Sequence, residues 1–423
     1  AQRRAGHGPM DVIRVASGNF LEMYDFMVFG YYAAAIGRAF FPTIDPFAGL
    51  MLSLMTFGAG FLMRPIGAVV LGAYTDRHGR RKGLILSLSL MSVGILTLAL
   101  CPDYRTIGLL APILVVLGRL VQGFSAGVEL GNVSVYLAEI APEGRKGFYV
   151  SWQSASQQVA VVTAAGIGAV LAAWLTPRQM GEFGWRIPLL VGCVIAPFLF
   201  LLRRSLAETD AFKARAAPPS LERIWRGLIG HWRAVLIGMA LATMTTVSFY
   251  MITAYTPTFG GLLKLPAGQT LLVTACVGVS NLFWLPVMGA VSDRLGRRPV
   301  LIACTLAALA TAYPLMAWLS ADPGFGRMLT VELWLSFVYA SYNGAMVVFL
   351  TEIIPEEVRA SGFSLSYSLA TAIFGGFTPA ISTWLIHITG NHAMPGAWLS
   401  AAAAAGLTAA LVARPEQPSA GTG

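Results

Sequence analysis

The stretch 118–129 places charged and amide side chains inside a long apolar run. If this run is a helix, spacings of three and four residues put six polar side chains on one stripe. These are Arg119, Gln122, Ser125, Glu129, Asn132 and Tyr136. A charge at the centre of a bilayer costs ~2.5–3.5 kcal/mol or more and is rarely kept unless it lines a polar path. The stripe therefore predicts a polar cavity that crosses a membrane.

Arg119 has the chemistry to anchor a carboxylate. It lies about 12 residues into its apolar run, roughly 18 Å along a helix and so near the middle of a bilayer. A guanidinium can donate two parallel hydrogen bonds to one carboxylate. The alternative is a buried arginine that only pairs with an acid to hold helices together. Arg64, in an earlier apolar run, is either a second carboxylate clamp or a structural counter-ion for Glu129 or Asp25.

Acidic side chains in the same runs are candidate proton carriers. Glu22 and Asp25 lie three residues apart on one helical face, and two such carboxylates in a low dielectric do not ionise together easily. Glu129 is ten residues from Arg119, ~15 Å along a helix, so Arg119 is expected to meet an acid from another helix. Asp25 is the first candidate for proton coupling, ahead of Glu22 and Glu129. The alternative is a permanently ionised structural pair.

Neutral polar side chains complete the candidate site. Gln153 and Gln157 lie four residues apart in a later run, where amides either donate to carboxylates or bind neighbouring helices. The spans of the second half are expected to contain no Lys, Arg, Asp or Glu and to orient the substrate through hydroxyl and amide groups. Packing is the alternative role of each tyrosine. The candidate substrate contacts are Arg119, Tyr32, Gln122, Gln153, Gln157, Tyr250, Asn281, Tyr342, Asn343 and Arg64.

The composition is that of a polytopic membrane protein. Of 423 residues, 56% are hydrophobic and 12% are charged, whereas soluble proteins carry roughly 25% charged residues. The net charge of +9 lies in short loops between apolar runs, which argues against a nucleic-acid-binding face. The four cysteines stand singly, so neither a disulfide framework nor a metal site is expected. No cofactor is expected, and the polar first residues predict no cleaved signal peptide.

Apolar runs of about 20 residues predict membrane-spanning helices. Twelve such runs lie near 15–37, 48–73, 83–101, 107–137, 148–175, 185–203, 233–257, 269–291, 299–319, 328–351, 361–388 and 396–413. Lys and Arg divide 21 to 6 between alternate loops, which predicts that both termini are cytoplasmic. The predicted fold is an all-α membrane protein with two six-helix halves. Its parts are a tail 1–14, a first half 15–203, a linker 204–232, a second half 233–413 and a tail 414–423.

An internal repeat supports the division into halves. Residues 72–81 and 289–298 share the pattern G-x-x-x-D-R-x-G-R-R, and residues 139–142 recur as 352–355. Matching halves predict a transporter built from parallel repeats, with its site at their interface near mid-membrane. An acid beside a helix N-terminus and nearby arginines can pair across the halves and separate again, so these loops are predicted gates. The gating candidates are Asp76, Arg77, Arg80, Asp293, Arg294 and Arg297.

These motifs resemble those of the major facilitator superfamily. The two loop copies resemble its signature, and Arg119-x-x-Gln122-Gly123 resembles its fourth-helix motif. Residues 18–26, 40–42, 64–67 and 122–127 are similar to the metabolite:proton symporter branch. Residues 147–158 and 372–382 are most similar to citrate–proton symporters and their tricarballylate-transporting relatives. The resemblance implies proton-coupled uptake of citrate or a related tricarboxylate by alternating access. The branch also carries 2-oxoglutarate and other dicarboxylates, shikimate, proline and betaine, so these cargoes stay open.

The expected partners are a small carboxylate, protons and the lipid of a bacterial cytoplasmic membrane, with the protein as a monomer and without nucleic acid. An enzyme would need a nucleophile and base or metal ligands, but the five histidines lie in loops, tails or span ends. A nucleotide-driven pump would need the pattern G-x-x-x-x-G-K-[ST], which the sequence lacks. A channel or a sensor derived from a transporter stays open as an alternative.

Overall fold

The computed structural model describes residues 20–43, 45–78, 80–127, 134, 137–138, 141–204, 221–355 and 358–413. Within these ranges the regular structure is helical and contains no strand, which confirms the all-α class. Eight of the described helices are long and apolar enough to cross a membrane, or nine if one bent pair counts as a single span. Each predicted apolar run contains a helix, while twelve crossings stay a prediction.

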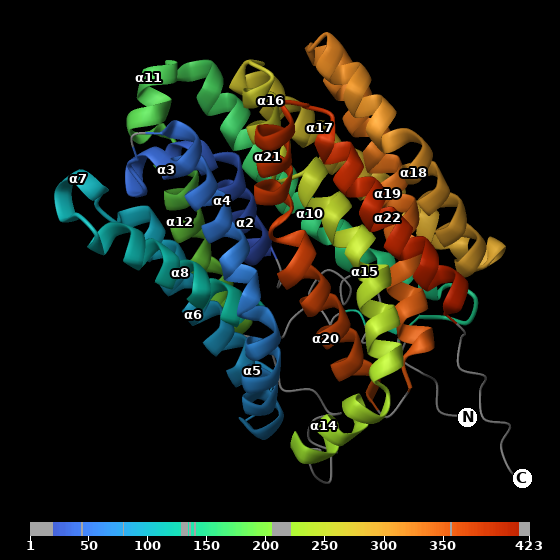
Figure 1. Cartoon of the computed structure of the whole chain (residues 1–423). Coiled ribbons are helices and arrows are strands. Elements are labelled where there is room, and N and C mark those ends of the chain that lie inside the picture. The colour runs from blue at the N-terminus through green and yellow to red at the C-terminus, as the bar shows by residue number, and fades with distance from the viewer. Residues whose placement is uncertain are drawn as a thin grey trace, which may run out of the picture.

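The first half forms the blue to green part of Figure 1. Its elements are α2 (Phe20–Tyr31), α3 (Ala33–Phe40), α4 (Pro46–Leu62), α5 (Arg64–His78), α6 (Arg80–Leu100), α7 (Tyr104–Ile107), α8 (Leu110–Ala126), α10 (Lys146–Trp174), α11 (Pro177–Gln179), the π-helix η2 (Met180–Gly184) and α12 (Arg186–Arg204). The start of α4 shows why a helix begins there. Asp45 precedes Pro46, and its carboxylate accepts a hydrogen bond of 3.0 Å from the Phe47 N–H.

The second half forms the yellow to red part of Figure 1. Its elements are α14 (Leu221–Gly230), α15 (Trp232–Ile252), α16 (Thr256–Leu262), α17 (Ala267–Leu295), α18 (Arg297–Ala321), α19 (Phe325–Ile353), α20 (Arg359–Ala370), the π-helix η4 (Thr371–Gly375), α21 (Thr378–Thr389) and α22 (Met394–Val412). Helix α14 occupies the last part of the predicted linker, and residues 205–220 lie outside the described ranges. In Figure 1, α14 lies at the same end of the molecule as the end of α5.

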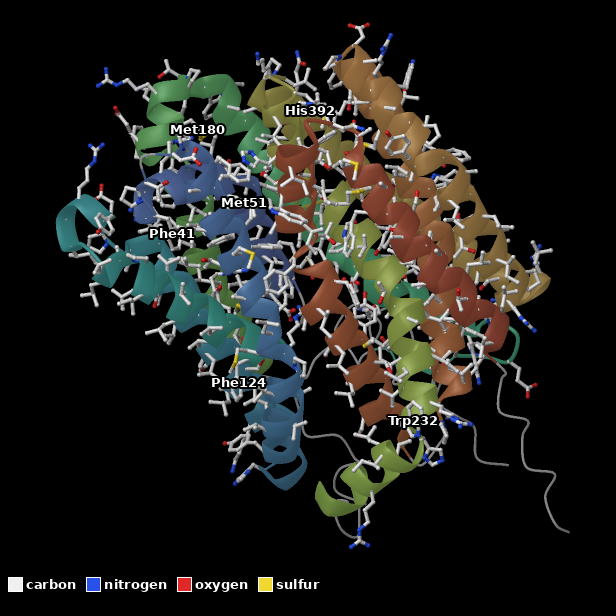
Figure 2. The ribbon with its side chains drawn as sticks, viewed as in Figure 1. Phe41, Met51, Phe124, Met180, Trp232 and His392 are labelled. Carbon is white, nitrogen blue, oxygen red and sulfur yellow. The ribbon has the colours of Figure 1, made fainter. Side chains whose placement is uncertain are left out.

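The outward faces of the helices carry large apolar side chains. Trp174, Val194 and Phe198 are 81%, 75% and 68% exposed. A soluble monomer rarely exposes so much apolar surface, whereas lipid covers such side chains at no cost. In Figure 2, Trp232 lies toward the end that carries α14, and Met180 and His392 lie toward the opposite end. The surface therefore fits a protein that spans a bilayer between these two ends.

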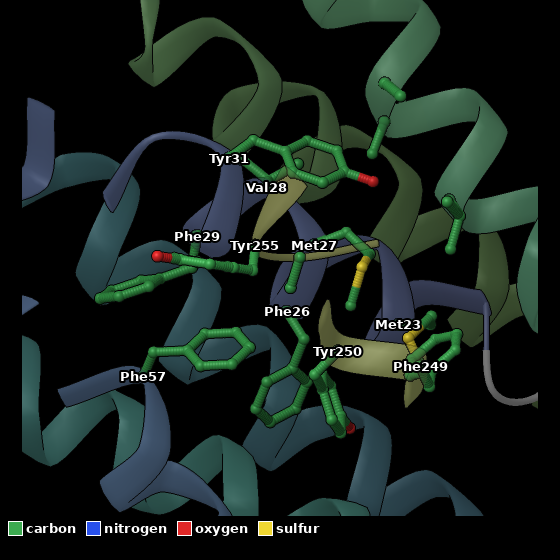
Figure 3. Packing of buried hydrophobic residues seen from close by; sticks show 14 of the residues in the cluster. Met23, Phe26, Met27, Val28, Phe29, Tyr31, Phe57, Phe249, Tyr250 and Tyr255 are labelled. Atoms are coloured by element: carbon green, nitrogen blue, oxygen red, sulfur yellow. The ribbon is translucent and has the colours of Figure 1, made fainter. Parts of the chain in front are cut away.

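Helix α2 lies at the centre of the molecule. Every residue from Leu21 to Tyr31 is buried, because α2 packs against α4, α10, α12 and, from the second half, α16. Its Phe26 and the ring of Phe57 from α4 lie 6.2 Å apart, and Phe57 lies 5.9 Å from Tyr250 of α15. Figure 3 shows these rings gathered at one place. An aromatic core thus joins the two halves beside the helix that carries Glu22 and Asp25.

The two halves also meet along α10 and α17, which pack closely together. At one point of this contact Gly147 faces Gly289, and a Cβ atom on either would overlap the backbone oxygen of the other. Only glycine permits backbones to approach so closely. Gly289, a residue of the repeated motif, therefore helps to set the distance between the halves.

Candidate functional site

Arg119 of α8 forms an ion pair with Asp25 of α2. Its Nη1 donates hydrogen bonds of 2.8 Å to Asp25 Oδ2 and 2.7 Å to Gln122 Oε1. Arg119 and Gln122 are 0% exposed and Asp25 is 1% exposed, so water does not screen the pair. The structure thus agrees with the prediction that Arg119 meets an acid from another helix.

Close packing of α8 on α4 puts Arg119 in reach of α2. A Cβ on Gly123 would overlap the carbonyl oxygen of Gly60, and a Cβ on Gly60 would lie 3.1 Å from the carbonyl oxygen of Arg119. Small residues let membrane helices approach in this way. One turn of α8 therefore carries two functions: its glycine sets the helix separation, and its arginine extends from that contact toward α2.

A second ion pair joins the same α2 face to α5. Arg64, the first residue of α5, donates through Nη2 to Glu22 Oε1, and the two side chains are 4% and 9% exposed. Of the alternatives for Arg64, pairing with Asp25 is not what the structure shows, because Asp25 pairs with Arg119. The other expected partner, Glu129, lies outside the described residues. Each α2 carboxylate thus faces its own guanidinium, which offsets the repulsion expected from their spacing of three residues.

Aromatic rings surround both guanidinium groups. The Arg119 Cζ atom lies 4.2 Å from the ring centre of Phe26 and 4.5 Å from that of Phe29. The Arg64 Cζ atom lies 5.5 Å from Phe26 and 5.0 Å from Phe61. Cations are attracted to ring faces within about 6 Å. Phe26 therefore contacts both arginines and helps to stabilise their charges in a low-dielectric environment.

Several buried polar atoms of this cluster have no hydrogen-bond partner among the described residues. They are Arg119 Nε and Nη2, Arg64 Nε, Gln122 Nε2 and Asp25 Oδ1. Buried polar groups in proteins are nearly always paired, so unpaired groups gathered at one place indicate a site for a ligand or for water. Four of these five atoms are nitrogen donors. Donors of this kind suit an anion with several carboxylate oxygens.

Tyrosines from the second half lie against the same cluster. Tyr250 of α15 lies near Arg64 and Arg119, and Tyr367 of α20 lies near Arg64. The Tyr250 ring also packs 5.0 Å from that of Phe61. Of the predicted contacts in the second half, Tyr250 is thus the one that the described structure brings to the two arginines.

Other predicted contacts are buried without meeting the arginines in a described hydrogen bond. In the described structure, neither side-chain polar atom of Asn343 has a partner, and the same holds for Gln153 Nε2 and the Tyr32 hydroxyl. Gln153 Oε1 accepts from the Ser154 hydroxyl at 2.8 Å, and Gln157 is 6% exposed. These four side chains stay candidates for the surroundings of the site.

Two predicted contacts have structural partners instead. The Tyr342 hydroxyl donates to the Leu241 carbonyl at 2.9 Å. Asn281 donates through Nδ2 to Gln158 Oε1 at 3.2 Å and accepts from the Ser336 hydroxyl at 2.8 Å. Asn281 thus links α10 of the first half to α17 and α19 of the second. Gln158 was not among the residues predicted from the sequence, although it directly follows Gln157. The sequence alone does not show which of two adjacent residues faces a neighbouring helix.

The expectation that the second-half spans carry no charged residue is wrong. Glu332 lies inside α19 and is 1% exposed. Its Oε1 lies 3.2 Å from the Thr256 hydroxyl oxygen, and its Oε2 has no partner among the described residues. The signal was present in the sequence, since Glu332 falls within the predicted run 328–351.

The second copy of the repeated loop connects the halves at the α14 end. Asp293 accepts hydrogen bonds from the backbone N–H groups of Gly147 at 2.8 Å and Phe148 at 3.1 Å, at the start of α10. Arg297 Nη2 donates to Asp293 Oδ1 at 2.6 Å. Gly296 has a φ of +87°, a left-handed conformation that glycine adopts without strain, and it makes the turn from α17 to α18.

The remaining candidates are described less fully. Arg294 is exposed. Asp76, Arg77 and Arg80 lie on α5 and α6, but their side chains are outside what the structure describes, as is all of Glu129. The gating role of both loops and the proton role of Glu129 therefore stay predictions.

The chain matches the Major Facilitator Superfamily over residues 15–366 and 263–422, and it belongs to that family. The protein is therefore a membrane transporter and not an enzyme, and the resemblance of its motifs is confirmed. It is 59% identical to a citrate-proton symporter of Klebsiella pneumoniae over 399 residues, 94% of this chain and 90% of that protein. It is 36% identical to the alpha-ketoglutarate permease of Escherichia coli (strain K12), over 86% of this chain and 84% of that protein.

Solved structures confirm the fold. A crystal structure of a D-xylose-proton symporter superposes with a TM-score of 0.75 at 20% identity, covering 95% of each chain. An inward open structure of the E. coli xylose transporter XylE gives a TM-score of 0.73 at 18% identity, covering 97% of each chain. At these identities the likeness concerns the arrangement of the helices alone.

Proposed function

We propose that this protein carries citrate or a related tricarboxylate into the cell together with protons, by alternating access across a bacterial cytoplasmic membrane. One observation carries the proposal: the buried Arg119–Asp25 pair, with two guanidinium nitrogens left without a described partner. The identity of 59% to a protein named a citrate-proton symporter supports the same cargo over that of the 36% identical alpha-ketoglutarate permease.

The pair provides a mechanism for coupling. In the state without substrate, Asp25 neutralises Arg119. When Asp25 takes up a proton, Arg119 loses its counter-ion, and a buried charge without a partner costs several kcal/mol. A substrate carboxylate then takes the place of Asp25 on Arg119. Proton and substrate therefore bind together or not at all, which is what symport requires.

The Glu22–Arg64 pair repeats this arrangement on the same helix face. Protonation of Glu22 would free Arg64 for a second carboxylate, and Tyr250 beside both arginines would donate to the substrate from the other half. Binding that draws together groups from both halves favours the closed, occupied state. The two halves then rock about the filled site.

The charge of the cargo determines how many protons are needed. A trivalent anion that enters a negative cell works against ~2.3 kcal/mol per charge per 100 mV. Three protons make the cycle neutral, and a fourth lets the membrane potential drive it. Asp25 and Glu22 supply two protonation sites of this cycle.

The α14 end of the molecule is the cytoplasmic end in this proposal, with both termini on that side and the protein acting as a monomer. The Asp293 contact with α10 then closes the cavity toward the cytoplasm and breaks when the halves part there. The loop with Asp76, Arg77 and Arg80 is the copy of this motif in the first half, and it acts in the same way there.

The decisive experiment is Asp25→Asn in proteoliposomes under an imposed proton gradient. Asparagine keeps the size of the side chain but takes up no proton, so uphill citrate accumulation should fall to background while citrate exchange persists. Normal proton-driven accumulation by the variant would show that Asp25 does not couple the proton. Uphill uptake by the unaltered protein also distinguishes a symporter from a channel, which only equilibrates.

A ligand panel tests the cargo. Citrate and tricarballylate should raise the melting temperature of the purified protein more than 2-oxoglutarate, shikimate, proline or betaine do. A clear shift with a monoanion or zwitterion, beside none with citrate, would exclude the tricarboxylate. The same panel on Arg119→Lys tests whether the planar guanidinium is required.

A further inference from the structure

Glu332 is a buried carboxyl group that the two arginine pairs do not involve. It lies in α19, is 1% exposed, and has Oε2 without a partner among the described residues. Its one described hydrogen-bonding neighbour is the Thr256 hydroxyl, whose oxygen lies 3.2 Å from Glu332 Oε1. An ionised carboxylate with a single hydroxyl beside it is costly in an apolar interior. The position therefore favours a protonated Glu332 in this conformation.

No charged group of the described residues neutralises Glu332. The elements packed most closely on α19 are α10, α15, α17, α18 and α20, and α16 contacts it through Thr256. Several of their charged or titratable groups, and some of α19 itself, have other partners: Asp293 and Arg297 with each other, Arg298 with Ala410 and Leu411, Arg327 with Asp322, and Tyr342 with Leu241. Among the described residues, no hydrogen bond or ion pair joins Glu332 to the others: Lys146, Tyr149, Arg233, Tyr250, Cys276, Arg294, Cys304, Tyr313, Tyr339, Glu352, Arg359 and Tyr367.

The Thr256 hydroxyl stands between Glu332 and a break in a helix. Its oxygen also lies 2.9 Å from the Ile252 carbonyl oxygen and 3.3 Å from that of Met251, at the end of α15. A hydroxyl has one proton to donate. If Thr256 donates to Ile252, Glu332 completes the contact only as a donor, that is, when protonated. An ionised Glu332 instead competes with the carbonyl groups for the same proton.

The break between α15 and α16 touches the helix that carries the acids of the site. A Cβ on Gly30 of α2 would lie 3.1 Å from the Cβ of Ala254, a residue of this break. Gly30 is one turn and a half along α2 from Asp25, and α16 also packs on α2. The break between α15 and α16 thus lies directly against α2.

We propose that Glu332 is a further proton-binding residue of the transport cycle, acting through Thr256 on the break between α15 and α16. The proton is held in the conformation described and leaves Glu332 to water when the halves rearrange. Thr256 then turns its hydroxyl from the Ile252 carbonyl to the carboxylate, which releases a carbonyl at the break. This inference rests on the proposed function, because it treats the protein as a proton-coupled transporter, and it adds a third site to Asp25 and Glu22.

Two measurements on Glu332→Gln test the proposal. The amide keeps the shape, can donate to Thr256 and is never ionised, so citrate exchange should persist. In infrared spectra of the purified protein without substrate, the carbonyl band of a protonated carboxyl group should lose one component in the variant. In proteoliposomes, the number of protons per citrate, measured from the reversal potential, should fall by one.

Each result has an opposite that overturns the proposal. An unchanged infrared band means that Glu332 holds no proton, and an unchanged proton number means that a held proton never leaves. Glu182→Gln, at an exposed acid that pairs with Arg178, is the matched control and should alter neither measurement. Thr256→Val provides a second variant: it should keep the infrared band but slow citrate exchange. Failure of the proposed function would show separately, as absence of citrate uptake by the unaltered protein, since the infrared measurement needs no substrate.

Discussion

The two halves of this transporter bury their acids in different ways. In the first half, Asp25 and Glu22 each face a guanidinium inside an aromatic shell. In the described part of the second half, Glu332 faces only a hydroxyl. A paired acid can stay ionised and exchange its partner for a substrate anion, whereas an unpaired one is stable only as a neutral acid. The comparison separates substrate-linked protonation from protonation that acts on the shape of a helix.

Removing Arg119 should have the largest effect. Arg119→Leu leaves Asp25 buried without its counter-ion, which costs about 3–5 kcal/mol, and it removes the substrate anchor. Asp25→Asn in the same chain should restore much of the lost thermal stability but no citrate binding. Thermal unfolding and citrate exchange of the two single variants and the double variant measure this coupling. If the stability losses of the two single variants simply add in the double variant, Arg119 and Asp25 do not stabilise each other, and the contrast between paired and unpaired acids fails.

The aromatic shell should matter less than the charges that it encloses. Phe26 lies against both guanidinium groups, and a cation–π contact in a desolvated site contributes about 1–2 kcal/mol. Phe26→Leu should therefore raise the KM for citrate roughly 5- to 30-fold, since ~1.4 kcal/mol is tenfold. Phe349→Leu is the control, because Phe349 is 1% exposed but packs in a separate apolar cluster. Equal effects of the two variants would mean that ring volume, rather than attraction to the arginines, is what counts.

Charge in the second half is also used at the end of a helix. Asp293 accepts two backbone hydrogen bonds at the start of α10, an arrangement that stabilises by about 1 kcal/mol. Asp293→Asn should weaken the closure at the α14 end and raise labelling of cysteines introduced into the cavity several-fold from that side. Asp322→Asn, at an acid 77% exposed, should leave labelling unchanged. Unchanged labelling in Asp293→Asn would mean that the loop is structural.

The sequence predicted the helices and the nature of the Arg119 pair because these depend on local rules. Ten residues of helix separate Arg119 from Glu129, so the partner of Arg119 had to come from elsewhere. The partner of Arg64 was not predictable in this way. It depends on the register between α5, which carries Arg64, and α2, which carries Glu22, and spacing within one helix carries no information on the register between two.

The same limit explains the errors in the second half. The sequence shows that Tyr342 and Asn343 are neighbours. It does not predict which of them faces a neighbouring backbone and which has no partner in the described structure. Glu332 was overlooked because it is a single acid in a long apolar run. Its contact with Thr256 can be recognised only once α19 is placed beside the break between α15 and α16.

The smallest predicted effect distinguishes two asparagines of the second half. Asn343 is 0% exposed and its amide atoms have no partner among the described residues, whereas Asn281 is held by Gln158 and Ser336. A neutral hydrogen bond contributes about 0.5–1.5 kcal/mol, so Asn343→Ala should raise the KM for citrate roughly 2- to 10-fold with little loss of stability. Asn281→Ala should do the reverse, lowering the melting temperature while leaving KM near its normal value. If both substitutions raise KM by the same factor, the polar link between α10, α17 and α19 belongs to the substrate site. The second half then takes part in substrate recognition through Asn281 as well as Asn343, in addition to the arginine pairs of the first half.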